Sequence, residues 1–381
     1  MRHENSVFHG LLKHIPWAVF DQLVTTHRAD YRVRRLSTRS QFVAMLYGQF
    51  SGAASLREIE IGLSSHSNHL YHLGAETVSR STLSDANARR SAKVFEGMFA
   101  ALVAKASRAT RRKMGGAVHL IDATTIKLSA NWARFSADSC AGKVHVIYDP
   151  DAAIPVYAAV TSANVNDITP AKTMPVETGA TYVFDLGYYD FAWWAQLKAR
   201  GCRIVTRLKS NTPLRIIEDR PVLAGSNILA DRIGHLNQRI GAGRANPYVD
   251  AVRELTVRIS TGKIIRVVTS DLEAPAQEIA DLYKRRWQIE LFFRWVKQTL
   301  RIRHFLGTSE NAVRIQVMVA LIAYMLLSMA KKTQAQIESP LAFARLVRAN
   351  LMHRKRTDQL IKPPPKQTNA DPQQLVMQWG N

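Results

Sequence analysis

The stretch LYKRRWQIELFFRWVK, residues 282–297, combines bulky apolar side chains with charged ones. In a helix, which turns about 100° per residue, Tyr283 begins a narrow polar stripe. The stripe continues through Arg286, Glu290 and Lys297, which lie roughly 60°, 20° and 40° to one side of it. Much of the remaining surface is apolar: Phe292, Trp295, Val296 and Leu300. A surface helix has one apolar stripe and a broad polar face. The sequence therefore predicts a helix that is buried except along a charged seam.

The charge of the whole chain indicates a polyanionic partner. The 381 residues carry a net charge of +22, with a pI near 10.3, and 46% of them are hydrophobic. This length and apolar content are enough for a sizeable core in two or three domains. A positive excess this large favours nucleic acid as the partner, with an anionic membrane as the second candidate.

Cysteine usage and hydropathy indicate a cytoplasmic protein. Cys140 and Cys202 are too few for a disulfide framework and lack metal-ligand spacing. Basic and histidine side chains interrupt the apolar residues of the first twenty positions, so we expect no signal peptide. The most apolar run, 317–330, is shorter than the roughly 20 residues that a membrane span needs. We expect it to be a buried core helix, and we expect no membrane partner.

Residues 1 to about 113 have the periodicity of helices. Apolar residues recur three and four apart in the segments 36–65 and 88–106. Between them, Gly74 and the Ser and Thr residues that follow can end one helix and cap the next, an arrangement consistent with a helix-turn-helix. The basic linker SRATRRKMGG, residues 107–116, then marks a domain boundary.

Beyond the linker the pattern becomes strand-like. AVHLIDATTIKLS (117–129) is an apolar run entering an Asp, and GKVHVIYDPDAAIPVYAAVTS (142–162) predicts a hairpin. ATYVFDLGYYD (180–190) predicts a short buried strand ending in Asp185, and a helix and a further strand follow over 191–208. These elements indicate an α/β domain with antiparallel strands at its start.

The rest of the chain is first strand-like and then helical. Short alternating stretches between about 207 and 262 predict strands, and helical character returns from about 276 to 351. The tail from 352 to 381 is basic and proline-containing, so we expect it to be extended or disordered, with non-specific DNA contact as an added role.

Three carboxylates stand out because of their positions. Asp122 and Asp185 each lie at the C-terminal end of, or just inside, a short apolar strand, where an ionised carboxylate is unfavourable unless it is paired or binds a metal. Glu290 lies on the largely buried helix. Three carboxylates in one cleft would form a hard oxygen site for Mg²⁺ or Mn²⁺. Two such ions about 4 Å apart can activate a water or a 3′-hydroxyl and stabilise the leaving oxygen of a phosphodiester.

Simpler interpretations exist for each residue alone. Glu290 and Arg286 can form a helical ion pair, which is common and contributes a few tenths of a kcal/mol. Asp122 can cap a strand. We expect Lys143 and His145 to be structural. We expect the remaining acidic residues near the strands to lie in turns and not to bind metal; these are Asp149, Asp151, Asp167 and Asp190. The stripe together with two strand-end aspartates favours a catalytic site.

The segments LIDATTIKL, VFDLGYYD and YKRRWQIELFFRWVK resemble the three catalytic segments of bacterial insertion-sequence DDE transposases. More narrowly, the chain resembles the insertion-sequence-four family, which has the signature Y-x2-R-x3-E-x6-K. That signature is complete here: Tyr283, Arg286, Glu290 and Lys297. The resemblance covers nearly the whole chain except the tail after about 352.

The resemblance implies an α/β fold in which an RNase H-like catalytic core is interrupted by a mostly β insertion and preceded by an all-helical N-terminal DNA-binding domain. The expected units are a helical domain (1–113), the first part of the core (114–206), the β insertion (207–262), the second part of the core (263–351) and a basic tail (352–381). The family's second-Asp motif has a Gly two residues on and then a Tyr, which Gly187 and either Tyr188 or Tyr189 match.

The resemblance also implies roles for the site residues. Asp122, Asp185 and Glu290 would be the catalytic residues and the ligands of two Mg²⁺ ions, for which Mn²⁺ can substitute. Basic and polar residues of the stripe would bind DNA phosphates; these are Tyr283, Arg286, Lys297 and the nearby Arg294. Trp287 borders the stripe, where it would either stack on a displaced base or, as is more usual for a tryptophan, pack in the core.

The function implied is a Mg²⁺-dependent DNA transposase of the cut-and-paste type. It would cleave double-stranded DNA at terminal inverted repeats and transfer the strands into target DNA, as a homodimer in the DNA complex and in a bacterial, nucleoid-associated setting. Two alternatives stay open. One is a catalytically silent DNA-binding protein derived from such an enzyme, and the other is a nuclease of the same fold that makes no new DNA joints.

Overall fold

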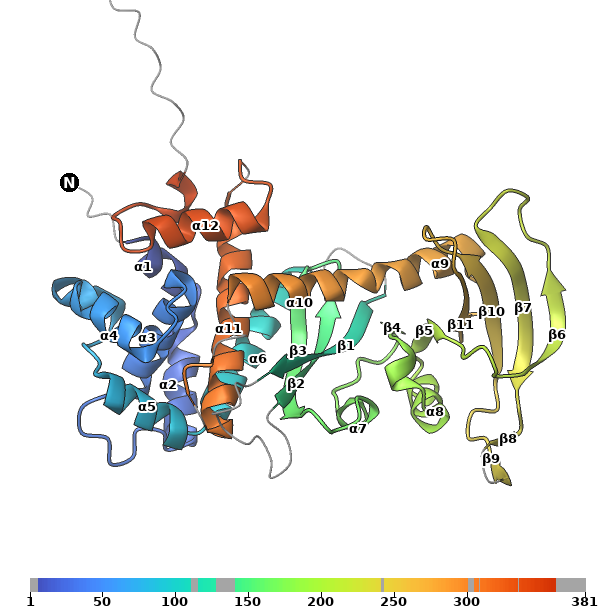
Figure 1. Cartoon of the computed structure of the whole chain (residues 1–381), viewed down its shortest axis with the longest axis horizontal. Helices are drawn as coiled ribbons and strands as arrows, with labels where there is room; N and C mark the ends of the chain where they lie inside the picture. Colours follow the sequence, from blue (N-terminus) through green and yellow to red (C-terminus); the bar gives the residue numbers. More distant parts are fainter. Residues whose placement is uncertain are drawn as a thin grey trace, which may run out of the picture.

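The computed structural model describes residues 6–110, 116–127, 141–240, 243–300, 305–307, 309–334 and 336–360. Much of the basic linker and most of the C-terminal tail lie outside these residues, so the expectation of an extended or disordered tail is not tested. The described part is a mixed α/β structure with helices at one end and a long sheet at the other (Figure 1).

Six helices form the N-terminal part of the protein: α1 (Val7–Leu12), α2 (Trp17–Thr26), α3 (Thr38–Ser51), α4 (Leu56–Ser64), α5 (Arg80–Arg89) and α6 (Lys93–Thr110). Four of them begin after a serine whose side chain accepts a hydrogen bond from the backbone N–H three residues on: Ser6, Ser37, Ser55 and Ser79. Such caps satisfy backbone donors that the first helical turn leaves free. The predicted helical N-terminus is therefore confirmed.

The predicted helix-turn-helix is not formed by α4 and α5. Residues 65–79 separate the two helices and contain a 3₁₀ helix, η1 (Ser67–Leu73), followed by Gly74 with φ of 66°. The turn of a helix-turn-helix has three or four residues. Gly74 does end a helix in the left-handed conformation, as expected, but it ends η1.

Two C-terminal helices, α11 (Glu310–Lys331) and α12 (Pro340–Asn350), belong to the same hydrophobic core as the N-terminal helices. In Figure 1, α11 runs between the helical end and the sheet, and it contacts α3, α5 and α6. The predicted core helix over 317–330 is confirmed, because nearly all of its side chains are buried. Among the described residues, α11 alone is long and apolar enough to cross a membrane, and 78% of its most apolar window is buried inside the protein.

The sheet has nine strands in the order β3-β2-β1-β4-β5-β11-β10-β7-β6. Strands β1 to β3 are antiparallel neighbours, and β4 and β5 run parallel to β1. The bounds are Val118–Lys127, Ala141–Asp149, Ile154–Ser162, Thr181–Val183, Arg203–Arg207, Leu214–Arg220, Ile228–Leu236, Ala251–Arg258 and Ile264–Thr269 for β1 to β7, β10 and β11. A small separate pair is formed by β8 (Arg239–Ile240) and β9 (Arg244–Ala245).

The sequence predictions for the strands are largely confirmed. The hairpin is β2 and β3, with Asp149 at its turn. The strand-like region 207–262 forms β6, β7 and β10, which continue the same sheet. One difference concerns β1, which is longer than expected: it extends five residues beyond Asp122, so this carboxylate lies inside the strand, the second of the two positions expected.

Helices cover both faces of the first half of the sheet. Side chains of a strand alternate between faces. Leu120 of β1 belongs to the core shared with α10 (Trp287–Thr299), whereas its neighbour Ile121 belongs to a second core that includes α8 (Phe191–Ala199). The short α7 (Ile168–Ala171) lies on the α8 side, and α9 (Ala276–Arg285) packs on β5, β7, β10 and β11.

A buried ion pair ties the outer strands to α9. The Arg253 guanidinium on β10 donates two hydrogen bonds, of 2.6 and 2.7 Å, to Asp231 on β7, and both side chains are only 4% exposed. The same guanidinium donates to the carbonyls of Leu272 and Ala274, just before α9. The segment that leads into α9 and α10 is thus attached to the centre of the outer sheet.

Candidate active site

Three elements bring the predicted carboxylates together. Asp122 lies in β1, and Asp185 follows β4 and caps a 3₁₀ turn, η2 (Leu186–Tyr188). Leu120 pairs with Val183 in the parallel β1–β4 ladder, so Asp122 and Asp185, each two residues later, point to the same face of the sheet. Glu290 lies in the first turn of α10, the helix that packs on β1.

Arg286 contacts two of the three carboxylates. Its Nη2 is 2.5 Å from Glu290 Oε1, and its Nη1 is 3.6 Å from Asp122 Oδ2. The helical ion pair that the sequence allows is therefore formed. The same guanidinium also reaches a carboxylate on a different element, which an ion pair confined to the helix would not do.

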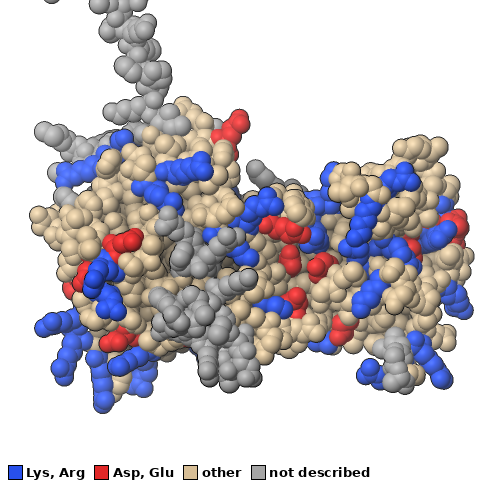
Figure 2. Space-filling view, viewed as in Figure 1, with Lys and Arg blue, Asp and Glu red and all other residues tan. Residues whose placement is uncertain are grey.

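The pKa of Asp122 reflects its burial and the charges around it. The pKa of Asp122 is raised to about 6, chiefly by burial and in part by the negative charges of Asp185 and Glu290. The Ala123 N–H, 2.8 Å away, and Arg286 act in the opposite direction. Acidic side chains gather in the middle of this face of the molecule, with Lys and Arg on both sides (Figure 2). Repulsion from a nearby carboxylate disfavours the charged form of Asp122 and therefore raises its pKa.

The donor set fits a divalent cation in its chemistry. Three carboxylates whose charges disfavour one another provide the oxygen ligands that Mg²⁺ and Ca²⁺ prefer. Among the described residues, no group of three or more His, Cys, Asp and Glu side chains is close enough to hold a metal ion as it stands. Because Arg286 contacts both Asp122 and Glu290, its guanidinium must shift before both carboxylates can bind one ion.

The polar stripe spans two helices and not one. Helix α9 ends at Arg285 and α10 begins at Trp287, so Arg286 is the residue that joins them. The Tyr283 ring lies 6.0 Å from the Arg286 guanidinium. Lys297 lies two turns beyond Glu290 and lines a small cavity together with residues of β1 and β2, among them Thr124. Tyr283, Arg286 and Glu290 are thus brought together, and Lys297 extends the stripe along the strands.

Trp287 is not a core residue. Its side chain is 50% exposed, because α10 packs through the opposite side of the helix. The Arg294 guanidinium lies 6.0 Å from the Trp287 ring. The more usual role expected for this tryptophan is therefore wrong, and its ring is accessible beside a cation at the rim of the carboxylate site.

Arg207 is a residue of this site that the sequence reasoning missed. It ends β5, and since Val205 pairs with Val183, it lies beside Asp185 on the same face of the sheet. Its Nε is buried without a hydrogen-bond partner among the residues described. It also lies close enough to Tyr283 to lower the pKa of that hydroxyl, which burial raises. The signal was present in CRIVTRL, an apolar strand that ends in a charged residue, as the two aspartate strands do.

The two tyrosines after Asp185 have different surroundings. The Gly187 N–H donates a 2.8 Å hydrogen bond to Asp185, and a Cβ at Gly187 would lie 3.0 Å from that carboxylate. The Tyr188 hydroxyl is buried without a described partner, and burial and the charges of Asp122, Asp167 and Asp185 raise its pKa. Tyr189 instead contacts Thr212, away from the carboxylates.

Asp167 is a fourth carboxylate beside the site, although we expect it from the sequence to serve a turn. Its side chain makes no capping hydrogen bond to α7. Lys143 Nζ lies 2.9 Å from Asp167 Oδ1, and the other carboxylate oxygen lies close to Gly187. By contrast, Asp149 and Asp190 do accept hydrogen bonds from turn and helix N–H groups, as predicted.

His145, beside this network, is structural as predicted and gives the fold a specific pH dependence. Its side chain is fully buried, and burial lowers its pKa from 6.5 to about 4, with Asp167 opposing and Lys143 adding to the effect. Protonation therefore favours the unfolded chain. The contribution of neutral His145 to the free energy of unfolding is fully present above pH 6.5. It falls by about 3 kcal/mol as the pH drops towards 4.

We expect His145→Gln to remove this part of the acid sensitivity. Urea unfolding of both proteins above pH 6.5 and near pH 4 measures it, and the wild type should lose about 3 kcal/mol more than the variant between the two. Equal losses would show that His145 titrates normally in the folded protein.

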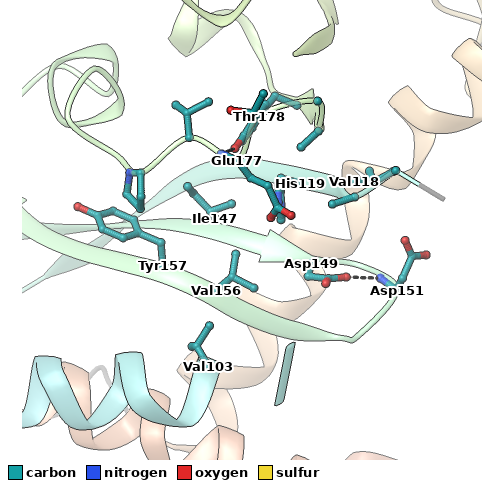
Figure 3. Close-up of a pocket in the computed structure, with 17 residues that line it drawn as sticks. Val103, Val118, His119, Ile147, Asp149, Asp151, Val156, Tyr157, Glu177 and Thr178 are labelled. Atoms are coloured by element: carbon teal, nitrogen blue, oxygen red, sulfur yellow. Dashed lines mark hydrogen bonds and ion pairs between the residues drawn. The ribbon is translucent and has the colours of Figure 1, made fainter. Parts of the chain in front are cut away.

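A cavity of about 670 Å³ lies near the beginning of β1 and β4, and its lining does not include Asp122, Asp185 or Glu290 (Figure 3). His119 and Glu177 lie in its lining and form a 3.1 Å contact. Asp149 accepts the hydrogen bond from the Asp151 N–H that is drawn at the hairpin turn. The cavity contains none of the predicted site residues.

Comparison with known proteins identifies the family. Residues 114–326 match the family described as "Transposase DDE domain", and residues 3–76 match a domain of unknown function. A protein of Sinorhizobium fredii that is named provisionally as a transposase is 39% identical over 74% of this chain and 80% of its own length. A protein of Geobacillus stearothermophilus, also named provisionally as the transposase of an insertion sequence element, is 29% identical over 67% of this chain and 68% of its own.

A solved structure, the piggyBac transposase synaptic complex with hairpin DNA, aligns with 90% of this chain and 77% of its own at 9% identity. Its TM-score of 0.43 is too low to support a conclusion. The family match covers more than half of the chain and includes Asp122, Asp185 and Glu290. The protein therefore belongs to the bacterial insertion-sequence transposases that carry a DDE domain.

Proposed function

We propose that this protein cuts DNA at the terminal inverted repeats of an insertion element and joins the released ends to target DNA. The observation that supports the proposal is geometric: Arg286 contacts both Asp122 and Glu290, and Asp185 follows β4, the parallel neighbour of β1. Antiparallel β1 to β3 followed by parallel β4 and β5, with Asp122 on β1 and Asp185 after β4, support an RNase H-like core.

The three carboxylates are the proposed catalytic residues, and they would hold two Mg²⁺ ions. When bound, such ions supply a lowered pKa for the attacking hydroxyl and stabilise the leaving oxygen. The protein's part is to hold the scissile phosphodiester in place. Water attacks the phosphorus, the bond to the 3′ oxygen breaks, and a 3′-hydroxyl and a 5′-phosphate result. That hydroxyl then attacks a phosphodiester of the target, the bond from that phosphorus to the target's 3′ oxygen breaks, and the element end is joined while a target 3′-hydroxyl is released.

The cations around the carboxylates position the DNA. Arg286 and Lys297 bind phosphates next to the scissile one, Tyr283 donates a hydrogen bond to another, and Arg207 adds a fourth contact from β5. We place the chain in the insertion-sequence-four family because all four signature residues are present and Arg286 lies against both Tyr283 and Glu290. Half-exposed Trp287 stacks on a displaced base, with Arg294 beside it.

The test is a strand-cleavage and joining assay with the full chain, Mg²⁺ and duplex DNA that carries the inverted repeats flanking the gene. We expect cleavage at the repeat ends, 3′-hydroxyl products and new joints to target DNA, all dependent on the divalent cation. Two protomers are expected in the complex, because two ends must be brought together. Cleavage without joints would indicate a nuclease, and binding without cleavage would indicate a silent DNA-binding protein.

A further inference from the structure

The connection between α2 and α3, residues 27–36 with the sequence HRADYRVRRL, is a dense cluster of exposed positive charge. We call it the arginine loop. Its four arginines are all exposed and form no ion pair with any residue in the described ranges: Arg28, Arg32, Arg34 and Arg35. In Figure 2 basic side chains gather at the lower left, over this connection and α5. The charge is therefore available to a partner.

An aromatic ring organises two of these arginines. Tyr31 is 60% exposed, and the guanidinium groups of Arg28 and Arg32 lie 5.0 and 5.2 Å from its ring centre. Each such contact is worth about 0.5–1 kcal/mol at an exposed site. Attraction to one ring holds two like charges near each other, and an anion placed between them would relieve their repulsion.

The backbone of the arginine loop is held in an unusual shape. Arg28 and Arg32 have φ of 49° and 58°, and they are two of the three non-glycine residues with left-handed φ in the described part of the chain. Such a conformation is unfavourable for an arginine and persists only where the surroundings impose it. It tends to occur at binding and catalytic sites, where the shape itself is useful.

Three side chains of the arginine loop attach it to the rest of the protein. Ala29 and Leu36 are buried, and the Asp30 carboxylate accepts hydrogen bonds of 2.7 and 2.6 Å from the N–H and the hydroxyl of Thr38 at the start of α3. The one acidic residue of the arginine loop is therefore engaged with α3. It holds the loop in position and forms no ion pair with the arginines.

We propose that the arginine loop binds the phosphate backbone of duplex DNA, with Arg28 and Arg32 as a preformed pair around Tyr31. Planar guanidinium groups match phosphate geometry, and a preorganised pair loses less freedom on binding. A membrane surface fits less well, because Tyr31 is the only large exposed hydrophobic side chain in the loop. The inference rests on the proposed function only in taking DNA as the partner, and it concerns affinity and not sequence recognition.

The test compares two variants of equal charge. Arg28→Asn/Arg32→Asn removes both cations and keeps residues that tolerate left-handed φ. The control, Lys198→Asn/Arg200→Asn, removes two exposed charges between the end of α8 and the start of β5. Asp185 lies at the other end of the parallel strands, after β4. Binding of the full chain to an element-end duplex and to an unrelated duplex is measured against salt concentration, without divalent cations. Thermal melting shows whether both variants fold.

The expected result is that the loop variant binds both duplexes about tenfold more weakly and that its log affinity depends on log salt with a slope smaller by about 2. The control variant should retain the wild-type slope. Tyr31→Ala, which removes the ring without changing charge, should weaken binding, and Tyr31→Phe should not. Equal behaviour of the loop variant and the control variant would overturn the proposal. So would loss of binding to anionic phospholipid vesicles with DNA binding unchanged.

The binding test of the arginine loop and the cleavage test of the proposed function can fail independently. If the wild type cleaves element ends but the loop variant binds like the control, only the arginine loop proposal fails. If the wild type binds duplex DNA through the loop but never cleaves it, only the proposed catalytic function fails.

Discussion

Replacing Asp122, Asp185 or Glu290 with its isosteric amide is expected to reduce strand cleavage by about 10³-fold or more while DNA binding is retained, a loss of about 4 kcal/mol of transition-state stabilisation. An amide keeps the size of the side chain and removes the negative charge that a divalent cation requires. The measurement is the initial rate of cleavage of an element-end duplex, alongside the affinity for the same duplex.

The matched control is Asp149→Asn, at the hairpin turn, where an amide can still accept hydrogen bonds from the Asp151 and Ala152 N–H groups. It should cleave at the wild-type rate. Asp122→Asn should also be at least as stable as the wild type above pH 6 without metal, since burial disfavours the charged carboxylate there. Full cleavage by any one of the three amide variants would remove that residue from the catalytic set.

Arg253→Ala is expected to lower the free energy of unfolding by about 3–5 kcal/mol, because it leaves the buried Asp231 carboxylate without its partner. It also removes the donor that holds the Leu272 and Ala274 carbonyls before α9. Urea unfolding measures the loss. Replacing both members of the pair with apolar residues, Arg253→Met/Asp231→Leu, should cost less than Arg253→Ala alone.

The control for this prediction is an ion pair of the same types at the surface. Arg314 and Glu310 lie one turn apart on α11 with a 2.7 Å contact, and Arg314→Ala should cost less than about 1 kcal/mol. Comparable losses of unfolding free energy in Arg253→Ala and Arg314→Ala would show that burial does not determine how much the Arg253–Asp231 pair contributes to stability.

Much of the fold and the candidate carboxylates could be identified from the sequence because they rest on local patterns. An apolar run followed by Asp located Asp122 and Asp185, and helical spacing grouped Tyr283 with Arg286 and Glu290. Strand periodicity also identified β6, β7 and β10. These signals need only neighbours in the chain.

The features that were missed depend on contacts between distant segments. Arg207 joins the site only because β5 pairs with β4, and Asp167 does so through Lys143 on β2. The exposure of Trp287 follows from which side of α10 meets the sheet. The domain limits predicted from the sequence stay a prediction, although the core shared by α11 and the N-terminal helices crosses one of them.

That shared core has a consequence for how the protein is made. About 200 residues separate the end of α6 from the start of α11, and ribosomes synthesise the chain from its N-terminus. Until α11 emerges, the apolar surfaces of α3, α5 and α6 that it covers have no partner. The N-terminal helices, with their arginine loop, can therefore reach their final packing only after the strands and α10 have been synthesised. Maturation of the proposed DNA-binding end waits for a nearly complete chain, so a prematurely ended translation product would lack a finished DNA-binding surface.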